Sequence, residues 1–417
     1  MSPASDIITP LPHDDVSPRV RHLLATAYSA FLERGYEAVS LDAVAREAGV
    51  SKETIYRHFT DKEALFRAAM EGERRPFSLR VGQFAAQGGA AWERLARYAR
   101  AIHDSAVEGG YLAGLWLTIS IARQMPETAS LLLRDSLARM EPLRQELAHI
   151  AAGRGKPGVV PLELAADFGA LAVEGPLYLM GAPKRDPDGR ALHAKATSLL
   201  FLDGALPRTA WVMPPPLSCQ APPPPAYPAH IARLLTVAAD QFRAQGFQAV
   251  SLNAIGAAAR AGRGTLYRHF GSKAQLFAAA MRLEAARLAA APTAQPYSLS
   301  DYLAKASAAL TSADAIALQC ATIAEARRDP ALALDIHQSL RAPWRPPLAR
   351  WLATAAREAQ LPLPDPDWLA GQVITLATIG NRPLSRAAVP DETDRRQAVG
   401  RALAILDRGF TSTLRTG

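Results

Sequence analysis

Two short segments carry the most conspicuous set of hydrogen-bonding and charged side chains in this chain. Each reads Tyr-Arg-His-Phe and is followed, after two more residues, by a lysine: Tyr56 to Lys62, and Tyr267 to Lys273. Neither segment contains paired carboxylates, a nucleophile beside a base, or the spacing of metal ligands. The residue types therefore favour binding over catalysis, and we expect no enzyme activity, no cofactor and no metal.

The two segments belong to one longer repeat. Residue n matches residue n+211 without a gap, which pairs Phe31 with Phe242 and Gly35 with Gly246. Roughly half of the positions between 31 and 70 are identical in this register, and the period is too long for a solenoid. The repeat therefore indicates a duplicated domain or a duplicated whole protein.

Each copy is predicted to fold as a helix-turn-helix unit. Apolar residues at 20, 23, 24, 27 and 31 form the stripe of an amphipathic helix, which Gly35 closes. Ser40 is placed to cap a second helix, Gly49 to supply a left-handed turn, and Ser51 to cap a third helix over 52–58. A fourth helix is expected to start near residue 61 or 62, and its counterpart at 272 or 273.

Bulk composition indicates ordinary globular material with unevenly distributed charge. The chain has 417 residues, 49% hydrophobic residues and a net charge of +8. Residues 19–75 contain ten Lys/Arg and nine Asp/Glu, whereas residues 230–287 contain eight and two. No signal-like segment or apolar run long enough for a membrane helix is present. We expect a soluble cytoplasmic protein whose two cysteines, Cys219 and Cys320, are reduced and unpaired.

The frame of both copies resembles a known DNA-binding domain. Gly-aromatic, Ser-Leu, an Ala-rich helix, a turn and Thr-x-Tyr-x-His-Phe-x-x-Lys follow the pattern of the N-terminal domain of the TetR family of bacterial transcriptional regulators. The resemblance implies an all-α fold with two three-helix DNA-binding heads, each followed by a helical ligand-binding and dimerisation domain. It also implies a sequence-specific, ligand-responsive repressor that binds a double-stranded operator and a small-molecule effector, associating with the nucleoid when bound.

The resemblance assigns contacts residue by residue. Ser40, Tyr56, His58 and Lys62 are placed at the DNA backbone, with Ser251, Tyr267, His269 and Lys273 as their second-copy equivalents. The resemblance implies that residues behind the Ser51 cap can reach bases: Lys52, Glu53, Thr54 and Arg57, with Arg263, Gly264, Thr265 and Arg268 as their second-copy equivalents. Arginine and lysine pair with guanine and glutamate accepts from cytosine, so the two heads are expected to read different bases.

The second copy departs from the pattern at its turn. Arg260 and Gly262 stand where the first copy has Gly49 and Ser51. Arginine in a left-handed turn costs of order 1 kcal/mol, and glycine orders a helix start less than serine. Between 260 and 273 the second copy has four basic residues and no acid. We therefore expect a softer second head that holds phosphate strongly and reads bases less selectively.

The helical regions that follow the heads also appear in duplicate, in the register n+204. This register pairs Ile119 with Ile323 and Pro126 with Pro330, and it requires a seven-residue length difference between the copies. The halves meet at a linker in which nine of 23 residues are proline. The expected division is a flexible arm, a first head, a first helical domain, the linker, a second head and a second helical domain: 1–17, 18–70, 71–206, 207–229, 230–284 and 285–417.

Family resemblance predicts a dimerisation bundle and a ligand pocket in the helical regions. The bundle helices are expected at 161–180, 190–205, 366–380 and 392–412, forming a pseudo-dimer within one chain; association of two chains is the alternative. Candidate pocket residues, for which core or surface roles remain open, are Trp92, Tyr98, His103, Trp116, Arg123, Tyr178, Gln319, Arg327, His337 and Trp344, with Trp351 and Trp368.

A second class of function stays open. In it the chain is an interaction or sensor protein whose second head has lost specific DNA binding, as the changes at Arg260 and Gly262 allow.

Overall fold

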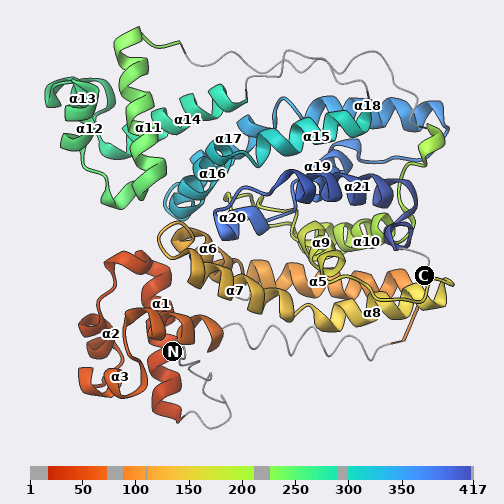
Figure 1. The fold of residues 1–417 in the computed structure, drawn as a ribbon, viewed down its shortest axis with the longest axis horizontal. Helices are drawn as coiled ribbons and strands as arrows, with labels where there is room; N and C mark the ends of the chain where they lie inside the picture. The colour runs from red at the N-terminus through yellow and green to blue at the C-terminus, as the bar shows by residue number, and fades with distance from the viewer. Residues whose placement is uncertain (1–16, 73–87, 109–110, 211–225, 290–297, 415–417) are drawn as a thin grey trace, which may run out of the picture. The chain divides into compact units, whose positions relative to one another are not determined.

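A computed structural model describes residues 17–72, 88–108, 111–210, 226–289 and 298–414, and these residues form helices without a strand (Figure 1). The chain divides into two compact units, residues 1–77 and 78–417. The expected arm, most of the linker and Cys219 lie outside the described residues. The six-part division of the chain remains a prediction.

The smaller unit contains the first head. Its helices are α1, α2 and α3, followed by a helix over 62–72: α1 Pro18–Ala38, α2 Leu41–Glu47 and α3 Lys52–His58. Gly35 has φ 78° and ψ 162°, so α1 kinks there. Phe31 packs edge-on against Phe66 at 5.0 Å between ring centroids, and Tyr36 stacks on Phe31 at 5.7 Å. These rings form the core on which α2 and α3 are held.

The larger unit contains the first helical half, the second head and the second helical half. The first half comprises α5 Ala91–Glu108, α6 Tyr111–Ile121, α7 Pro126–Ala138, α8 Glu141–Gly153, α9 Leu162–Ala172, α10 Pro187–Asp203 and the short η2 Arg208–Ala210. The second head comprises α11 Ala229–Ala249, α12 Leu252–Ala259, α13 Arg263–Phe270 and α14 Lys273–Leu288. The second half comprises α15 Leu299–Leu310, α16 Ala313–Glu325, α17 Pro330–Arg341, α18 Arg345–Glu358, α19 Pro366–Ala377, α20 Arg382–Arg386, α21 Glu392–Arg408 and η3 Phe410–Thr413.

Helix positions repeat as the sequence registers predict. Helices α1, α2 and α3 begin 211 residues before α11, α12 and α13, at 18, 41 and 52 against 229, 252 and 263. Helices α7, α8 and α9 begin 204 residues before α17, α18 and α19, at 126, 141 and 162 against 330, 345 and 366. The kink repeats as well, because Gly246 has φ 79° and ψ 164°. The change of register therefore falls between the heads and α7.

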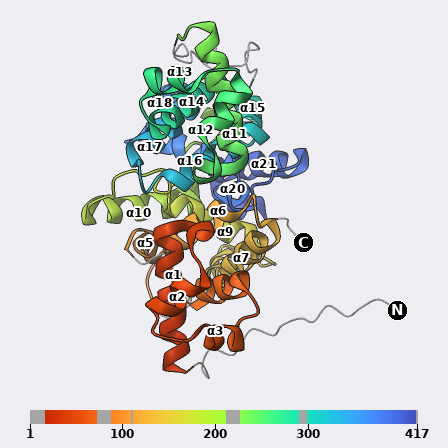
Figure 2. The ribbon, with the colours of Figure 1, turned by 90° about the vertical axis from the view of Figure 1, so that its left-hand side faces the viewer.

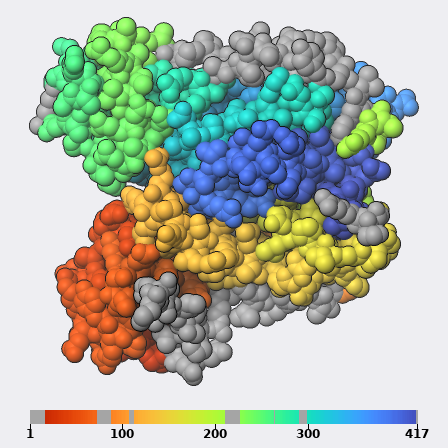
Figure 3. All heavy atoms as spheres, viewed as in Figure 1, coloured from red at the N-terminus to blue at the C-terminus, as the bar shows by residue number. Residues whose placement is uncertain are grey.

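Within the larger unit the last helices of the two halves pack against each other. Helices α9 and α10 contact α19 and α21, and these four lie side by side in Figure 1. In the space-filling view the second-half helices, in blue, meet the first-half helices, in yellow, along a seam (Figure 3). In the view turned by 90°, α6 lies next to α16 and α20 (Figure 2). Helices α9, α19 and α21 lie within the ranges expected for the dimerisation bundle, and α10 begins three residues before its expected range of 190–205.

Two glycines let the ends of α10 and α21 cross closely. A Cβ on Gly204 would lie 2.8 Å from the Asp407 carbonyl oxygen, and one on Gly409 would overlap the Leu202 carbonyl. The Ala205 and Leu206 amides donate to the Leu406 carbonyl oxygen at 2.9 and 3.0 Å. Both glycines also have positive φ, 79° and 74°. Any side chain at either position would force the two halves apart.

Buried polar contacts fix the pairing of the two halves. Asp167, 2% exposed, accepts from Arg382 at 2.5 Å and from Arg401 at 2.8 Å. The side-chain amide of Gln372 donates to the Leu171 carbonyl oxygen at 3.2 Å. A buried carboxylate is stable only when it is paired in this way. The register between the halves is therefore set by specific charges as well as by apolar contact.

Two further expectations concern cysteine and the membrane. Cys320 is a free buried thiol, and burial raises its pKa to about 12. No single helix in the described ranges is long and apolar enough to span a bilayer, although α15 and α16, bent by 58° at their junction, pass that test as a pair.

Candidate DNA-binding interface

Serine caps hold α2 and α3 of the first head in a helix-turn-helix. Ser40 Oγ accepts from the Ala43 amide at 3.2 Å, and Ser51 Oγ accepts from the Thr54 amide at 3.1 Å. Gly49, with φ 63°, makes the left-handed turn between the helices. The cap residues and the glycine are those that the sequence predicts. The serines accept hydrogen bonds from free helix amides, and the glycine adopts a positive φ.

Helix α3 buries one stripe and exposes the rest. Ile55 and the following Phe59 are buried, whereas the remaining residues of the helix keep exposed or partly exposed side chains. Tyr56 is 51% exposed, which is unusual for a large aromatic residue. Thr54 Oγ1 lies 2.9 Å from Ser51 Oγ, on the same open surface. This face presents hydroxyl, guanidinium and imidazole groups to solvent without burying them.

Lys62 sits over the kinked end of α1. Its Nζ donates to the Glu37 carbonyl oxygen at 3.3 Å and lies 4.4 Å from the centroid of the Tyr36 ring. Partial burial lowers the pKa of Lys62. Lys273 repeats the arrangement, with Nζ 3.2 Å from the Gln248 carbonyl oxygen and 4.7 Å from the Phe247 ring centroid. The two lysines are therefore held in the same place by the same kind of contact.

The second head preserves the exposed face of the first. Tyr267 is 44% exposed, and Arg268 and His269 are also exposed. Ser251 Oγ caps α12 by accepting from the Ala254 amide at 3.1 Å. Thr265 is partly exposed, and Arg263 begins α13. The side chain of Arg263 lies outside the described part of the structure.

The turn of the second head is strained as expected. Arg260 ends α12 with φ 52° and ψ 42°, in the left-handed region, and Gly262 starts α13 without a side-chain cap. A Cβ on Gly256 would lie 2.9 Å from the Ala261 carbonyl oxygen, so this turn also passes close to α12. Arginine in such a conformation carries a steric cost that glycine avoids.

Ion pairs distinguish the two heads in a way that sequence analysis missed. In the first head Lys52 pairs with Asp42 at 2.9 Å, and the hydrogen bond to Asp42 raises the pKa of Lys52. In the 211-residue register the corresponding pair is Asn253 and Arg263. The first head therefore holds Lys52, which we predict to reach bases, with an acid that the second head lacks. Asp42 and Lys52 are ten residues apart on either side of a turn, so no periodic pattern in the sequence indicates their pairing.

A buried charge cluster anchors the second head to the second half. Arg243 of α11 donates to Glu284 of α14 at 2.7 Å and to Asp314 of α16 at 2.9 Å. Arg243 and Glu284 are 9% and 3% exposed. Arg123 of the first half donates to the Arg243 carbonyl oxygen. This head is consequently connected to both helical halves through one arginine.

Comparison with known proteins identifies the family. A family model described as bacterial regulatory proteins, tetR family, matches residues 23–69 and 234–280, and one described as the AefR-like transcriptional repressor, C-terminal domain, matches 297–407. The DNA-binding transcriptional repressor TetR of Mycobacteroides abscessus is 32% identical over 147 residues, covering 33% of this chain and 70% of that protein. The chain belongs to the TetR family. It is thus a DNA-binding transcriptional regulator, a non-enzymatic class of protein.

Other relatives match shorter parts of the chain or are similar at lower identity. The HTH-type transcriptional activator FasR of Mycolicibacterium smegmatis is 41% identical over 61 residues, which cover 15% of this chain and only 26% of that activator. Among solved structures, the flavonoid-responsive regulator FrrA is 27% identical with a TM-score of 0.37, over 43% of this chain and 95% of FrrA. A TetR-family regulator from Mesorhizobium loti is 22% identical with a TM-score of 0.37, over 44% of this chain and 96% of its own length.

Most of the candidate pocket residues of this TetR-family chain lie in its core or bridge its elements. Tyr98, His103, Gln319, Trp344 and Trp351 are almost fully buried. Trp116 donates to the Ile323 carbonyl oxygen at 2.6 Å, with Arg327 5.7 Å above its ring, while Arg123 reaches α11 and Trp92 packs beneath Lys195. His337 and Trp368 line a cavity. Their roles in ligand binding remain predictions.

One buried network joins two of those candidates to residues that the sequence did not indicate. His103 Nε2 lies 3.1 Å from the Tyr178 hydroxyl, which donates to Glu174 at 3.1 Å. Glu174 accepts from Arg185 through both oxygens, at 2.8 and 2.9 Å. Burial and the nearby His193 lower the pKa of His103 to about 4. The imidazole is therefore neutral near pH 7.

Proposed function

We propose that this regulator is a ligand-responsive repressor that acts as a single-chain pseudo-dimer on an imperfect palindrome. The observation that carries the proposal is the packing of α9 and α10 against α19 and α21 within one chain. A four-helix contact made inside the chain uses the surfaces through which two separate subunits would otherwise pair. One chain then carries both reading helices, α3 and α13.

The two heads are proposed to read unequal half-sites. Helix-turn-helix dimers place their reading helices in successive major grooves, about 34–36 Å apart. The proposed contacts are the residues assigned to each head above, with Tyr56, Lys62, Tyr267 and Lys273 at phosphates. Because the second head combines unopposed basic charge with a strained turn, its binding depends more on phosphate and less on base identity.

Selection of bound DNA from a random pool with the purified chain, followed by the mass of the complex in solution, tests the proposal. We expect one chain per site and two half-sites of unequal information content. Two chains on one site would show that the heads of separate molecules pair and would contradict the pseudo-dimer.

A variant pair separates this proposal from a sensor whose second head no longer binds DNA. Tyr267→Ala with Lys273→Ala removes the proposed phosphate contacts of the second head, and Tyr56→Ala with Lys62→Ala is the matched change in the first. Both pairs are expected to lower operator affinity by at least roughly ten-fold and to reduce its salt dependence, since each removes ionic and hydrogen-bonded phosphate contacts. Unchanged affinity for the second-head pair would favour the sensor.

The proposal of repression draws on the Mycobacteroides abscessus repressor, of which this chain covers 70%, whereas the match to the activator covers 26%. Placing the selected operator between a promoter and a reporter gene tests it. Repression predicts lower reporter output with the wild-type chain than with the double variant of the first head, and higher output would indicate activation.

A further inference from the structure

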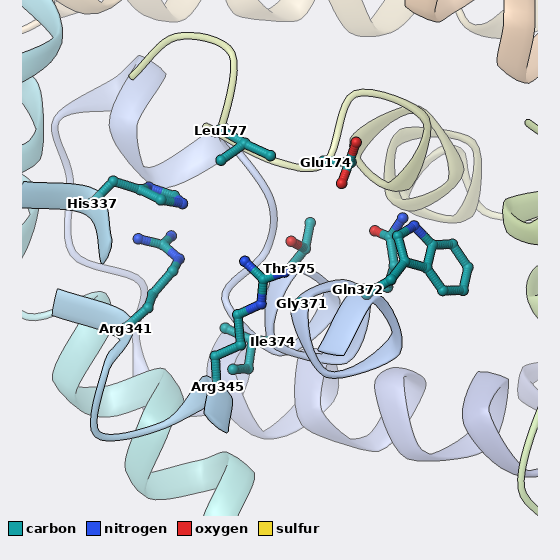
Figure 4. A pocket seen from close by; sticks show the side chains of 10 residues that line it. Glu174, Leu177, His337, Arg341, Arg345, Gly371, Gln372, Ile374 and Thr375 are labelled. Atoms are coloured by element: carbon teal, nitrogen blue, oxygen red, sulfur yellow. The ribbon is translucent and has the colours of Figure 1, made fainter. Parts of the chain in front are cut away.

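A cavity in the larger unit is lined mainly by the second half. Helices α17 and α18 contribute His337, Arg341 and Arg345, and α19 contributes Gln372. Glu174 of the first half completes one wall. In Figure 4 the imidazole and the two guanidinium groups converge from one side of the cavity, with Glu174 and Gln372 on the other. The site thus presents two arginines and a histidine to a common space.

Of the charged groups that line this cavity, Arg341 has no carboxylate partner among the described residues. Glu174 is paired through both oxygens with Arg185, which lowers the pKa of Glu174 despite its burial. Arg345 is paired with Asp367 at 2.6 Å. Among the described residues no carboxylate pairs with Arg341, and burial together with the nearby Arg345 lowers its pKa to about 9. At pH 7 Arg341 therefore remains a cation without a counter-charge.

Three polar atoms lining the cavity are buried without a hydrogen-bond partner among the described residues. They are Nη1 of Arg341, Nδ1 of His337 and Oε1 of Gln372. His337 and Gln372 are 4% and 1% exposed, so water does not satisfy these groups from bulk solvent. A buried polar group without a hydrogen-bond partner destabilises the protein, and it does so more strongly when it is charged. A cluster of them facing one cavity is the pattern of a binding site whose occupant would satisfy them.

The cationic cluster occurs in one half only. In the 204-residue register that aligns α7 with α17, the positions of His337, Arg341 and Arg345 are Leu133, Leu137 and Glu141. The first half thus has two leucines and an acid where the second has the imidazole and both guanidinium groups. Because the backbone positions are the same, the fold does not require these cations.

From these observations we propose that Arg341, His337 and Gln372 form a binding site for the carboxylate group of a small organic acid, present only in the second half. This site would define the chemical class of the effector, so the inference rests on the ligand response proposed above. The guanidinium and imidazole groups donate to the carboxylate oxygens, and the Gln372 oxygen accepts from a hydroxyl or from the water that accompanies the ligand. The cavity has a volume of about 30 Å³, which accommodates a carboxylate group rather than a bulky ring system.

Calorimetric titration of the full-length chain with sodium acetate, without DNA, tests the site. Acetamide, of the same shape and no charge, and sodium chloride at equal ionic strength are the comparison ligands. We expect saturable binding of acetate and little heat from acetamide or chloride. Equal binding of acetamide, or a response matched by chloride, would overturn the proposal.

Variants locate the binding. Arg341→Gln is expected to weaken acetate binding roughly ten- to hundred-fold, because it removes a charge-assisted hydrogen bond in a buried site. Arg350→Gln, at an exposed arginine of α18, is the matched control and is expected to retain wild-type affinity. Undiminished acetate affinity in Arg341→Gln would overturn the assignment. If that variant does not fold, Arg341→Leu, which copies Leu137 of the first half, takes its place.

The thermal stability of the protein without acetate is a second measurement. Substitution of Arg341 is expected to lower acetate affinity but not stability. Replacing an unpaired buried cation with a neutral residue relieves its desolvation cost, so Arg341→Leu is expected to unfold at the same or a higher temperature than wild type. A clear loss of thermal stability would instead assign Arg341 a structural role.

Operator binding is measured separately, with and without acetate. Acetate binding at Arg341 with unchanged operator affinity would leave the site in place while contradicting the proposed ligand response. If the wild-type chain does not bind acetate but its operator affinity changes with another small molecule, the carboxylate site is wrong and the proposed ligand response stands.

Discussion

At the residue scale, single side chains make the two DNA-binding heads unequal. Both heads expose the same tyrosine, arginine and histidine, but they differ at the turn and at one ion pair. Arg260 occupies a left-handed conformation that Gly49 adopts without strain, and Lys52 is held by Asp42, whose second-head counterpart is Asn253. These differences do not change the fold, and we expect each of them to alter how its head binds DNA.

Relieving the strained turn is expected to stabilise the second head. Arg260→Gly removes the left-handed penalty of the arginine, φ 52°, and should raise the free energy of unfolding by about 1 kcal/mol. The reciprocal change Gly49→Arg should lower the stability of the first head by a similar amount. Urea unfolding of the full chain, followed by hydrogen exchange in each head, measures both; no gain from Arg260→Gly would mean that the turn relaxes elsewhere.

Removing the acid beside the reading lysine is expected to strengthen DNA binding by the first head. Asp42→Asn, which copies the second head, frees Lys52 and removes a negative charge from the surface. Operator affinity should rise roughly two- to five-fold, the range of an exposed charge interaction. Fluorescence anisotropy against salt concentration measures it, and the gain should shrink in a Lys52→Ala background; an equal gain there would assign the effect to general charge.

At the scale of helices, the heads are built alike and attached by particular contacts. The kinks at Gly35 and Gly246 have almost the same backbone angles, and each places a lysine over the ring of the next residue along, Tyr36 or Phe247. The second head is then joined to α16 through the ion pair of Arg243 with Asp314. Attachment of this head to the helical body therefore uses a buried arginine, which Glu284 of α14 also pairs with.

Breaking that attachment is expected to be costly. Arg243→Met leaves Glu284, 3% exposed, with only the exposed Arg287 as partner, at 3.0 Å, and should destabilise the larger unit by about 2 kcal/mol. Arg282→Met breaks an exposed pair with Asp335 and should cost less than about 1 kcal/mol. Thermal and denaturant unfolding compare the two, and similar losses would mean that the Arg243 cluster contributes no more than a surface pair.

Sequence patterns predicted most of the helices because their boundaries are local. Ser40, Ser51, Ser251 and Ser272 each cap the helix expected, and both kinks fall at the glycines that close the apolar stripe. A cap needs only a side-chain oxygen three residues before the amide that it accepts from, so local sequence contains the information. The Asp42–Lys52 and Arg243–Glu284 pairs join residues ten and 41 positions apart, which no periodic pattern records.

At the scale of the whole molecule, the larger unit buries ionisable groups in its interior. His103, His193 and His337 are 1%, 3% and 4% exposed, and burial lowers the pKa of all three. His103 faces Asp104, Glu174, Arg190 and His193, and its pKa is about 4. Such groups make the stability of this unit depend on pH.

Acid is expected to destabilise the larger unit well before its carboxylates are protonated. Histidine in the unfolded chain titrates near pH 6.5, so the unfolded state binds more protons than the folded state between about pH 6.5 and 4, and stability falls as pH falls through that range. At pH 5 His103 alone should account for on the order of 2 kcal/mol. His103→Gln, neutral throughout, should reduce the difference in unfolding free energy between pH 7.5 and 5 by that amount; an unchanged difference would place the effect elsewhere.

The sequence alone determined that this protein has two helix-turn-helix heads and two helical halves of one family, because duplication and capping are properties of residue order. Only the tertiary structure shows how the two halves pack against each other. The crossing at Gly204 and Gly409, the pairing of Asp167 with Arg382 and Arg401, and the convergence of His337, Arg341 and Gln372 on one cavity bring together groups from distant helices. Their proximity follows from how distant helices pack against one another, which leaves no periodic trace in the chain.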